Sequence, residues 1–285
     1  MALKRIFLYN IFIFIGIYHS SYSQESNPFS HLSKEERMKL ADKYHDLSQT
    51  VYQTSEMHRT YKDSALMAVP NHVEYMQRAS YSYKKAGEHI KAMEMLNKAV
   101  KIDTTNGKTA ALEYKAWSML YFYRDYESTI KDVDKVIEIS KLPYKACHGE
   151  SCLLLKAQAY YQLGKYKKAI DTFNYLFALL KEQGADPKDD FLSNFYLARC
   201  YFKLNDFDKS LYYLEEQLAM PYSVKAELNF YAGQIYVLKN NTEKAKQHFL
   251  KAKELYLQND KLNEPYIERF DEIFLHDIEL EISEL

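Results

Sequence analysis

The chain contains 285 residues, of which only 7 are Gly and 6 are Pro. Sheet proteins need many turns and place both residue types in them, so this scarcity favours long helices joined by short connections. The 38 basic residues nearly balance the 39 acidic residues, which leaves no basic field of the kind that nucleic acid requires. We therefore expect a helical protein that does not bind nucleic acid.

The first residues have the pattern of a secretory signal peptide. Lys4 and Arg5 precede an apolar stretch over residues 6–18, which is too short to span a bilayer comfortably. Residues 21–23 form a small-x-small motif that predicts cleavage after Ser23, with Gln24 as the first mature residue. The alternative is an uncleaved anchor. We expect the mature chain to have no membrane span and to be periplasmic, outer-membrane associated or extracellular.

Export would place the three cysteines in an oxidising compartment, where disulfides persist. Cys147 and Cys152 are close in sequence and could pair, whereas Cys200 lies in a strongly helical stretch that favours a buried free thiol. A zinc site is not predicted, because no second Cys/His pair has suitable spacing.

Five stretches in the middle of the chain share one pattern of a helix, a tight turn and a second helix. The turn residues are Gly87, Arg124, Gly164, Asn205 and Asn240. Gly and Asn tolerate the left-handed backbone that ends a helix, so Arg124 is the exception. A small residue such as Ala92, Ala169 or Ala245 follows each turn and would let the paired helices approach closely.

This pattern resembles the tetratricopeptide repeat family, whose period is near 34 residues. The closest fits are Ala157, Tyr160, Gly164, Ala169 and Phe173 in the third repeat, and Gly233, Tyr236, Ala245, Phe249 and Ala252 in the fifth. The resemblance implies an all-α, right-handed α-solenoid. The repeats would occupy residues 73–259, with starts near Val73, Ala110, Glu150, Phe191 and Ala226.

Helical elements are also predicted on both sides of the repeats. Residues 24–72 read as a divergent helical pair, with a capping box at Ser33 and Glu36 and a second helix that stops before Pro70. Residues 260–285 read as an acidic capping helix opened by Pro265. Their last residues also show a strand-like alternation.

The resemblance implies a concave groove lined by the first helix of each repeat. Carrying the family's groove positions onto this chain gives Tyr81, Lys84, Lys85, Tyr114, Tyr121, Phe122, Leu154, Tyr161, Phe195, Arg199, Phe202, Lys203, Phe230 and Gln234. Aromatic residues and Arg dominate binding energy at interfaces, so a peptide or a partner's helix would fit there. The alternative is that many of these rings belong to the core or are covered by the flanking helices.

No motif for chemistry accompanies the repeats. The sequence has no phosphate-binding Gly-rich loop and no His-Glu-x-x-His or Gly-x-Ser-x-Gly motif. We therefore expect neither an enzyme nor a bound cofactor or metal. The favoured interpretation is an exported scaffold for protein–protein interaction in a bacterial envelope or secretion complex. A peptide- or glycan-capture module and the sensor part of a signalling protein are the alternatives.

Overall fold

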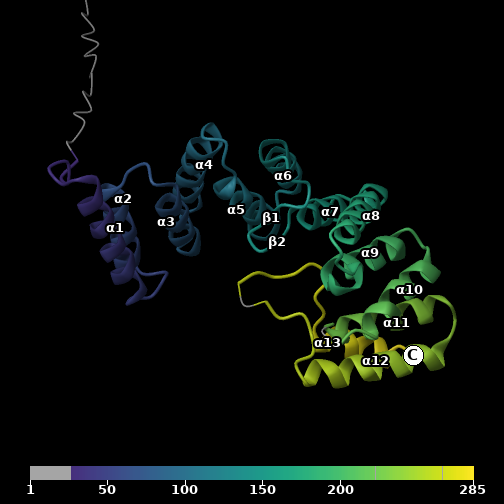
Figure 1. The fold of residues 1–285 in the computed structure, drawn as a ribbon. Coiled ribbons are helices and arrows are strands. Elements are labelled where there is room, and N and C mark those ends of the chain that lie inside the picture. Colours follow the sequence, from purple (N-terminus) through teal and green to yellow (C-terminus); the bar gives the residue numbers. More distant parts are fainter. Residues whose placement is uncertain (1–26, 222, 265) are drawn as a thin grey trace, which may run out of the picture.

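The computed structural model describes residues 27–221, 223–264 and 266–285 (Figure 1). The predicted signal segment, its cleavage site at Ser23 and Gln24, and Pro265 lie outside these residues. The α-helices of the described residues are α1 Lys34–Gln49, α2 Glu56–Ala68, α3 Val73–Lys85, α4 His89–Thr105, α5 Ala110–Ser118, α6 Tyr126–Ser140, α7 Cys152–Gln162, α8 Tyr166–Glu182, α9 Phe191–Lys203, α10 Phe207–Leu218, α11 Lys225–Leu238, α12 Thr242–Leu257 and α13 Leu275–Ser283.

Consecutive helices pack in pairs, and the pairs stack into one curved row, as Figure 1 shows. Within the repeats the pairs are α3/α4, α5/α6, α7/α8, α9/α10 and α11/α12. Each pair buries its apolar side on its neighbours, as in a solenoid. The pairs from α5/α6 onward share one large core, and two smaller clusters hold the helices before them. The prediction of an all-α solenoid is confirmed.

The N-terminal pair begins and ends where local sequence signals place it. The Ser33 hydroxyl accepts a hydrogen bond from the Glu36 backbone N–H at 3.2 Å, and the Ser33 N–H donates to the Glu36 carboxylate at 2.8 Å. This is the predicted capping box, which satisfies two otherwise unpaired groups at the helix start. Helix α2 ends at Ala68, two residues before Pro70.

The turns inside the repeats adopt the left-handed backbone that their sequences predict, including the exception. Arg124 has a φ of 56°, close to the 60° of Asn205. It follows a short π-helical turn, Met119–Tyr123, at the end of α5. Its guanidinium donates to the Glu268 carbonyl oxygen at 2.8 Å and lies 4.5 Å from the centre of the Phe270 ring. These contacts offset the cost of about 1 kcal/mol for a left-handed non-Gly residue.

The fifth pair shows why a small residue is needed in the first helix. A Cβ atom added at Gly233 would lie 2.6 Å from the Phe249 ring. Helices α11 and α12 therefore approach so closely that only glycine fits without a shift of the ring.

A two-stranded hairpin fills the longer connection between α6 and α7. Its strands are β1 Ala146–Cys147 and β2 Glu150–Ser151, and a disulfide joins Cys147 to Cys152 across its base. The hairpin holds His148 against α5, with the His148 ring centre 4.7 Å from that of Trp117. Cys200 is a buried free thiol.

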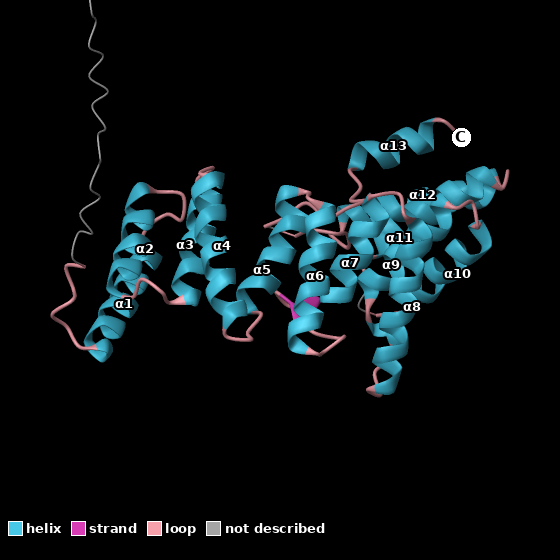
Figure 2. Cartoon of the chain, turned by 90° about the horizontal axis from the view of Figure 1, so that it is seen from above, coloured by secondary structure: helices cyan, strands magenta, loops and turns pink. Residues whose placement is uncertain are grey.

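The C-terminal region differs from its prediction. The expected helix from Pro265 through Phe270 is wrong for residues 266–274, because the helix there, α13, begins only at Leu275. Residues 266–273, called the crossing segment below, instead run across the helical row and lead to α13 (Figure 2). Their apolar side chains pack on several repeats at once, which a single straight helix would not allow. The strand-like alternation near the end belongs to α13.

Candidate functional site

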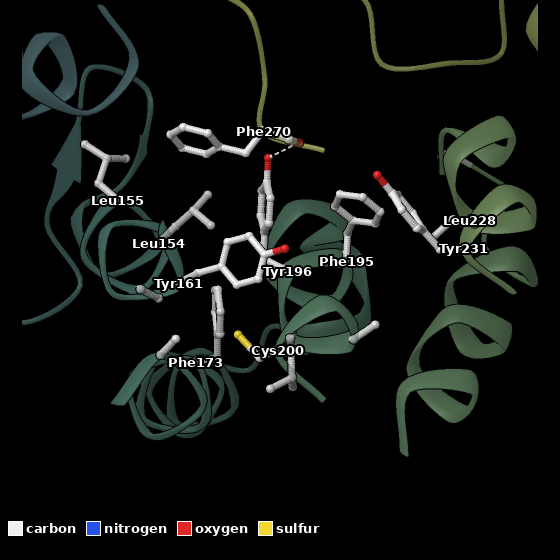
Figure 3. Close-up of a cluster of buried hydrophobic side chains, with 14 of the residues drawn as sticks. Leu154, Leu155, Tyr161, Phe173, Phe195, Tyr196, Cys200, Leu228, Tyr231 and Phe270 are labelled. Carbon is white, nitrogen blue, oxygen red and sulfur yellow. Dashed lines mark hydrogen bonds between the residues drawn. The ribbon is translucent and has the colours of Figure 1, made fainter. Parts of the chain in front are cut away.

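The C-terminal half of the concave face is filled by the chain's own crossing segment. The Tyr196 hydroxyl on α9 donates to the Phe270 carbonyl oxygen at 2.9 Å, as Figure 3 shows. The Tyr231 hydroxyl on α11 donates to the Asp271 carbonyl oxygen, also at 2.9 Å. Side chains of separate repeats thus bind the backbone of one irregular stretch of polypeptide.

Apolar contacts accompany these hydrogen bonds. The Phe270 side chain is only 7% exposed, and its ring centre lies 5.9 Å from those of Tyr121 and Tyr126. Ile267 and Ile273 on either side of it are buried too. The crossing segment is therefore part of the protein core and bridges the second repeat to the fifth.

Two buried ion pairs fix the crossing segment further. Arg199 on α9 lies 3.2 Å from the Asp271 carboxylate, and its guanidinium covers the Tyr231 ring at 3.6 Å. Arg269 pairs with Glu150 of the hairpin at 2.8 Å and donates to the Tyr121 hydroxyl at 2.9 Å. Since these charges are largely removed from water, losing one partner would be costly.

One buried acid lies at the entrance to this region. The Glu227 carboxylate on α11 accepts a hydrogen bond from the Leu262 backbone N–H at 3.0 Å. Burial raises the pKa of Glu227 to about 7. Its charge state therefore changes near neutral pH at the point where the chain leaves α12 for the crossing segment.

Most of the predicted groove residues in the C-terminal half are buried. Tyr121, Leu154, Tyr161, Phe195, Arg199 and Phe230 are buried. For these six the alternative interpretation, core or covered surface, describes the structure, because the crossing segment and neighbouring repeats occupy the concave side. Phe202, Lys203 and Gln234 remain accessible at an open hollow of about 610 Å³ beside α13.

The N-terminal half of the concave face is open. A cavity of about 510 Å³, called the N-terminal cavity below, lies between α1, α2, α3, α5, the hairpin and the start of the crossing segment. Of the predicted groove residues, Tyr81 and Tyr114 line it, and Tyr114 is only 4% exposed. Their neighbours on its apolar side are Trp117 and Tyr266. This cavity has an aromatic wall and room for a segment of a partner protein.

Lys84 lies behind this wall, although its repeat position predicts a surface cation. Its Nζ atom is within 5.5 Å of the ring centres of Tyr81, Tyr114, Trp117 and Phe122. Burial, followed by the charge of Lys85, lowers the pKa of Lys84 to about 8. Lys84 is 4% exposed and contributes to the packing of the wall, so its assignment to the accessible groove is corrected. Lys85 is half-buried and faces the Tyr266 ring at 5.3 Å.

Cationic and imidazole side chains of the divergent N-terminal pair face the aromatic wall. The Lys62 Nζ atom on α2 lies 2.7 Å from the His45 Nδ1 atom on α1. Burial, followed by the charge of Arg78, lowers the pKa of Lys62 to about 8. Burial and the charges of Lys62 and Arg78 lower the pKa of His45, so the neutral His45 ring can accept a hydrogen bond from the Lys62 ammonium group.

Sequence reasoning missed both Lys62 and the crossing segment. Lys62 belongs to the divergent N-terminal pair, which was not aligned with the family's repeat positions, so it was not predicted to line the groove. A signal for the crossing segment was present, since Ile267, Phe270 and Ile273 are apolar among charged residues at a spacing of three. The wrong helix prediction follows instead from Phe270, Phe274 and Ile278, whose spacing of four residues suits a helix.

The stacked pairs and their concave face define an α-solenoid repeat protein. Family profiles described as tetratricopeptide repeat match residues 73–106, 151–174 and 226–259, and a second such profile matches residues 193–216. The chain therefore contains tetratricopeptide repeats at these residues. The second pair, α5/α6, carries no profile match, in line with Trp117 where the family has a small residue.

Solved structures show the same fold at low sequence identity. PilW, a type IV pilus biogenesis factor, has a TM-score of 0.60 at 14% identity, covering 86% of this chain and 97% of PilW. PilF of Pseudomonas aeruginosa has a TM-score of 0.58 at 15% identity, covering 78% and 94%. A tetratricopeptide repeat protein of Parabacteroides merdae has a TM-score of 0.51 at 17% identity, covering 91% and 86%. No curated protein sequence matches the chain.

The described residues contain no group of three or more His, Cys, Asp or Glu side chains placed to hold a metal ion. No helix within the same residues has both the length and the apolar character needed to cross a membrane.

Proposed function

We propose that this protein is an exported scaffold that binds a segment of a partner protein in the N-terminal cavity. One observation carries the proposal. The concave face already holds an irregular stretch of polypeptide, the crossing segment, through side-chain hydrogen bonds to its backbone carbonyl groups. The same row of first helices continues past the crossing segment to Tyr81, where the face is open.

The composition of the cavity supports the same proposal. Aromatic side chains supply large contact areas at low cost in conformational entropy, and they are enriched where proteins bind one another. Tyr81, Tyr114 and Trp117 come from two neighbouring repeats, so they present one continuous wall to a ligand. Tetratricopeptide repeats act in general as protein-interaction scaffolds, which agrees with this arrangement.

Site-specific photo-crosslinking in living cells tests this proposal. A benzophenone amino acid replaces Tyr81 at the cavity, and the matched control places it at Tyr175, which is 48% exposed on α8. We expect Tyr81 to form a discrete crosslinked product whose partner is identified by mass spectrometry, and Tyr175 to form none. Identical products from both positions, or no product from Tyr81, would contradict the proposal.

Export is a separate part of the proposal. Its support is the positively charged and apolar start of the sequence, together with a Cys147–Cys152 disulfide of the kind that persists in oxidising compartments. PilW, which shares the fold, is a type IV pilus biogenesis factor, and we propose an envelope complex as the setting. Cell fractionation with N-terminal sequencing should find a mature protein that begins at Gln24. A cytoplasmic protein that retains Lys4 would contradict export.

A further inference from the structure

The polar lining of the N-terminal cavity has an excess of positive charge. Its two acids, Glu150 and Glu264, both pair with Arg269, at 2.8 Å and 3.7 Å. The remaining cations of the lining are Lys62 and Arg78. Arg78 pairs with Glu74, one turn away on its own helix, and this pair is partly exposed to water. The cavity lining contributed by α2 and α3 therefore contains cations and no carboxylate.

Lys62 is the lining cation that lacks a negatively charged partner. It is 4% exposed, and among the described residues it forms no ion pair with a carboxylate. Its partner is the neutral ring of His45, which can accept one hydrogen bond. A buried ammonium group without a counter-ion is unfavourable, so an arriving anion would relieve a cost that the free protein carries.

Apolar surface lies opposite the cations. Trp117 and Tyr114 lie with ring planes 17° from parallel and centres 6.3 Å apart, and the His148 ring closes one side. Tyr266, 62% exposed, stands at the mouth. A ligand that fits both sides needs a negative group and an apolar side chain close together. A volume of about 510 Å³ holds more than one small ion, which favours a short stretch of peptide.

We infer that the N-terminal cavity binds an acidic peptide segment, with a carboxylate of the segment paired to Lys62 and Arg78 and a neighbouring apolar side chain on Trp117 and Tyr81. This inference rests on the proposed function and specifies the partner's chemistry. The carboxylate supplies the counter-ion that Lys62 lacks. Charge-assisted hydrogen bonds of this kind are stronger than neutral ones and give selectivity against the uncharged amide.

Trp117 is the single tryptophan of the chain, so its fluorescence reports binding in this cavity directly. The full mature chain is titrated with the peptide Ala-Asp-Phe-Asp-Ala, acetylated and amidated so that side chains are its only carboxylates. The control peptide is Ala-Asn-Phe-Asn-Ala. We expect the acidic peptide to bind at least about tenfold more tightly and to weaken as salt rises.

Lys62→Met keeps the length of the side chain and removes its charge. We expect this variant to bind the acidic peptide no better than the neutral one, and Arg78→Gln to lose part of the difference. Lys98→Met, at an exposed position on α4, is the matched control and should bind as the unchanged protein does. Circular dichroism checks that each variant is folded.

The outcomes separate this inference from the proposed function. Equal affinity for both peptides, or an unchanged preference in Lys62→Met, would overturn the acidic class of ligand while leaving a protein-binding cavity intact. Absence of binding of either peptide at millimolar concentration would also overturn the inference. The crosslinking experiment at Tyr81 then decides independently whether a partner occupies the cavity.

Discussion

The two halves of the concave face use equivalent repeat positions in opposite ways. Tyr81 and Arg199 hold the same position in the first and fourth repeats. Tyr81 lines an open cavity, whereas Arg199 is buried against Asp271 of the crossing segment. The difference arises from a part of the chain outside the repeats. A groove inferred from repeat positions therefore shows where a ligand could lie, and the flanking segments decide which part stays free.

The two halves of the molecule also differ in how their apolar side chains pack. The C-terminal half shares one large core that extends from Leu112 to Ile278 and includes the crossing segment. The N-terminal pair packs in a smaller cluster, in which Ala41, Ala65 and Ala68 contact Tyr75 of α3. The walls of the N-terminal cavity come from elements of both clusters.

The largest expected effect comes from removing the main apolar anchor of the crossing segment. Phe270→Ala should lower the free energy of unfolding by about 4 kcal/mol, since a buried Phe leaves a large cavity. Tyr266→Ala, four residues earlier at the exposed mouth, should change it by less than about 0.5 kcal/mol. Urea unfolding of both variants measures the difference. Similar losses of unfolding free energy in both variants would mean that the crossing segment does not consist of a core part and an exposed part.

Breaking the buried ion pair should come next. Asp271→Asn preserves the left-handed backbone, which Asn tolerates, and leaves Arg199 without its charge partner. We expect a loss of about 3 kcal/mol in the free energy of unfolding. Adding Arg199→Met should recover most of it, because no uncompensated charge then remains buried. If the losses of the two single variants simply add, the two residues are not coupled.

The buried acid at the start of the crossing segment makes stability depend on pH. The pKa of Glu227 is about 7 in the folded protein, above its ordinary value of 4.5. Ionisation therefore destabilises the fold, with no effect below pH 4.5 and the full effect above pH 7. Glu227→Gln should raise the free energy of unfolding by about 2 kcal/mol at pH 8 and leave it unchanged at pH 4. A variant equally stabilised at both values would contradict this account.

The smallest effect concerns the open half. The pKa of Lys62 is about 8, so the ammonium group is present below that pH and is lost as pH rises. Affinity for the acidic peptide should fall roughly tenfold between pH 7 and pH 9, and affinity for the neutral peptide should stay constant. His45, whose pKa is lowered, is neutral throughout this range. A parallel fall for both peptides would point to a change in the protein rather than to Lys62.

Much of the fold follows from short-range sequence signals. The capping box at Ser33, the turn glycines and the small residues after each turn act within one helical pair, so their outcome depends little on the rest of the chain. Gly233 shows the same logic, since its size is required by the ring of Phe249 in the partner helix.

The site depended on contacts that no local pattern encodes. Arg124 forms its hydrogen bond with Glu268, which lies 144 residues away along the chain. Arg269 reaches Tyr121 over 148 residues. Such contacts bury residues that were predicted to line the groove. The residue types involved, aromatic residues and Arg, are suited both to a buried core and to an exposed binding surface. Lys62 was not predicted for a related reason. It lines the cavity only because the N-terminal pair faces the first two repeats, and no local pattern encodes that arrangement.

Limited proteolysis of the full chain with trypsin tests the division of the concave face most directly. The Arg269 side chain is 11% exposed and is held in two ion pairs, whereas Lys108 lies exposed in the turn after α4. We expect cleavage after Lys108 while the bond between Arg269 and Phe270 resists until the protein unfolds, and rapid cleavage at that bond in Phe270→Ala. Cleavage after Arg269 as fast as after Lys108 in the unchanged protein would show that the crossing segment does not fill the C-terminal half.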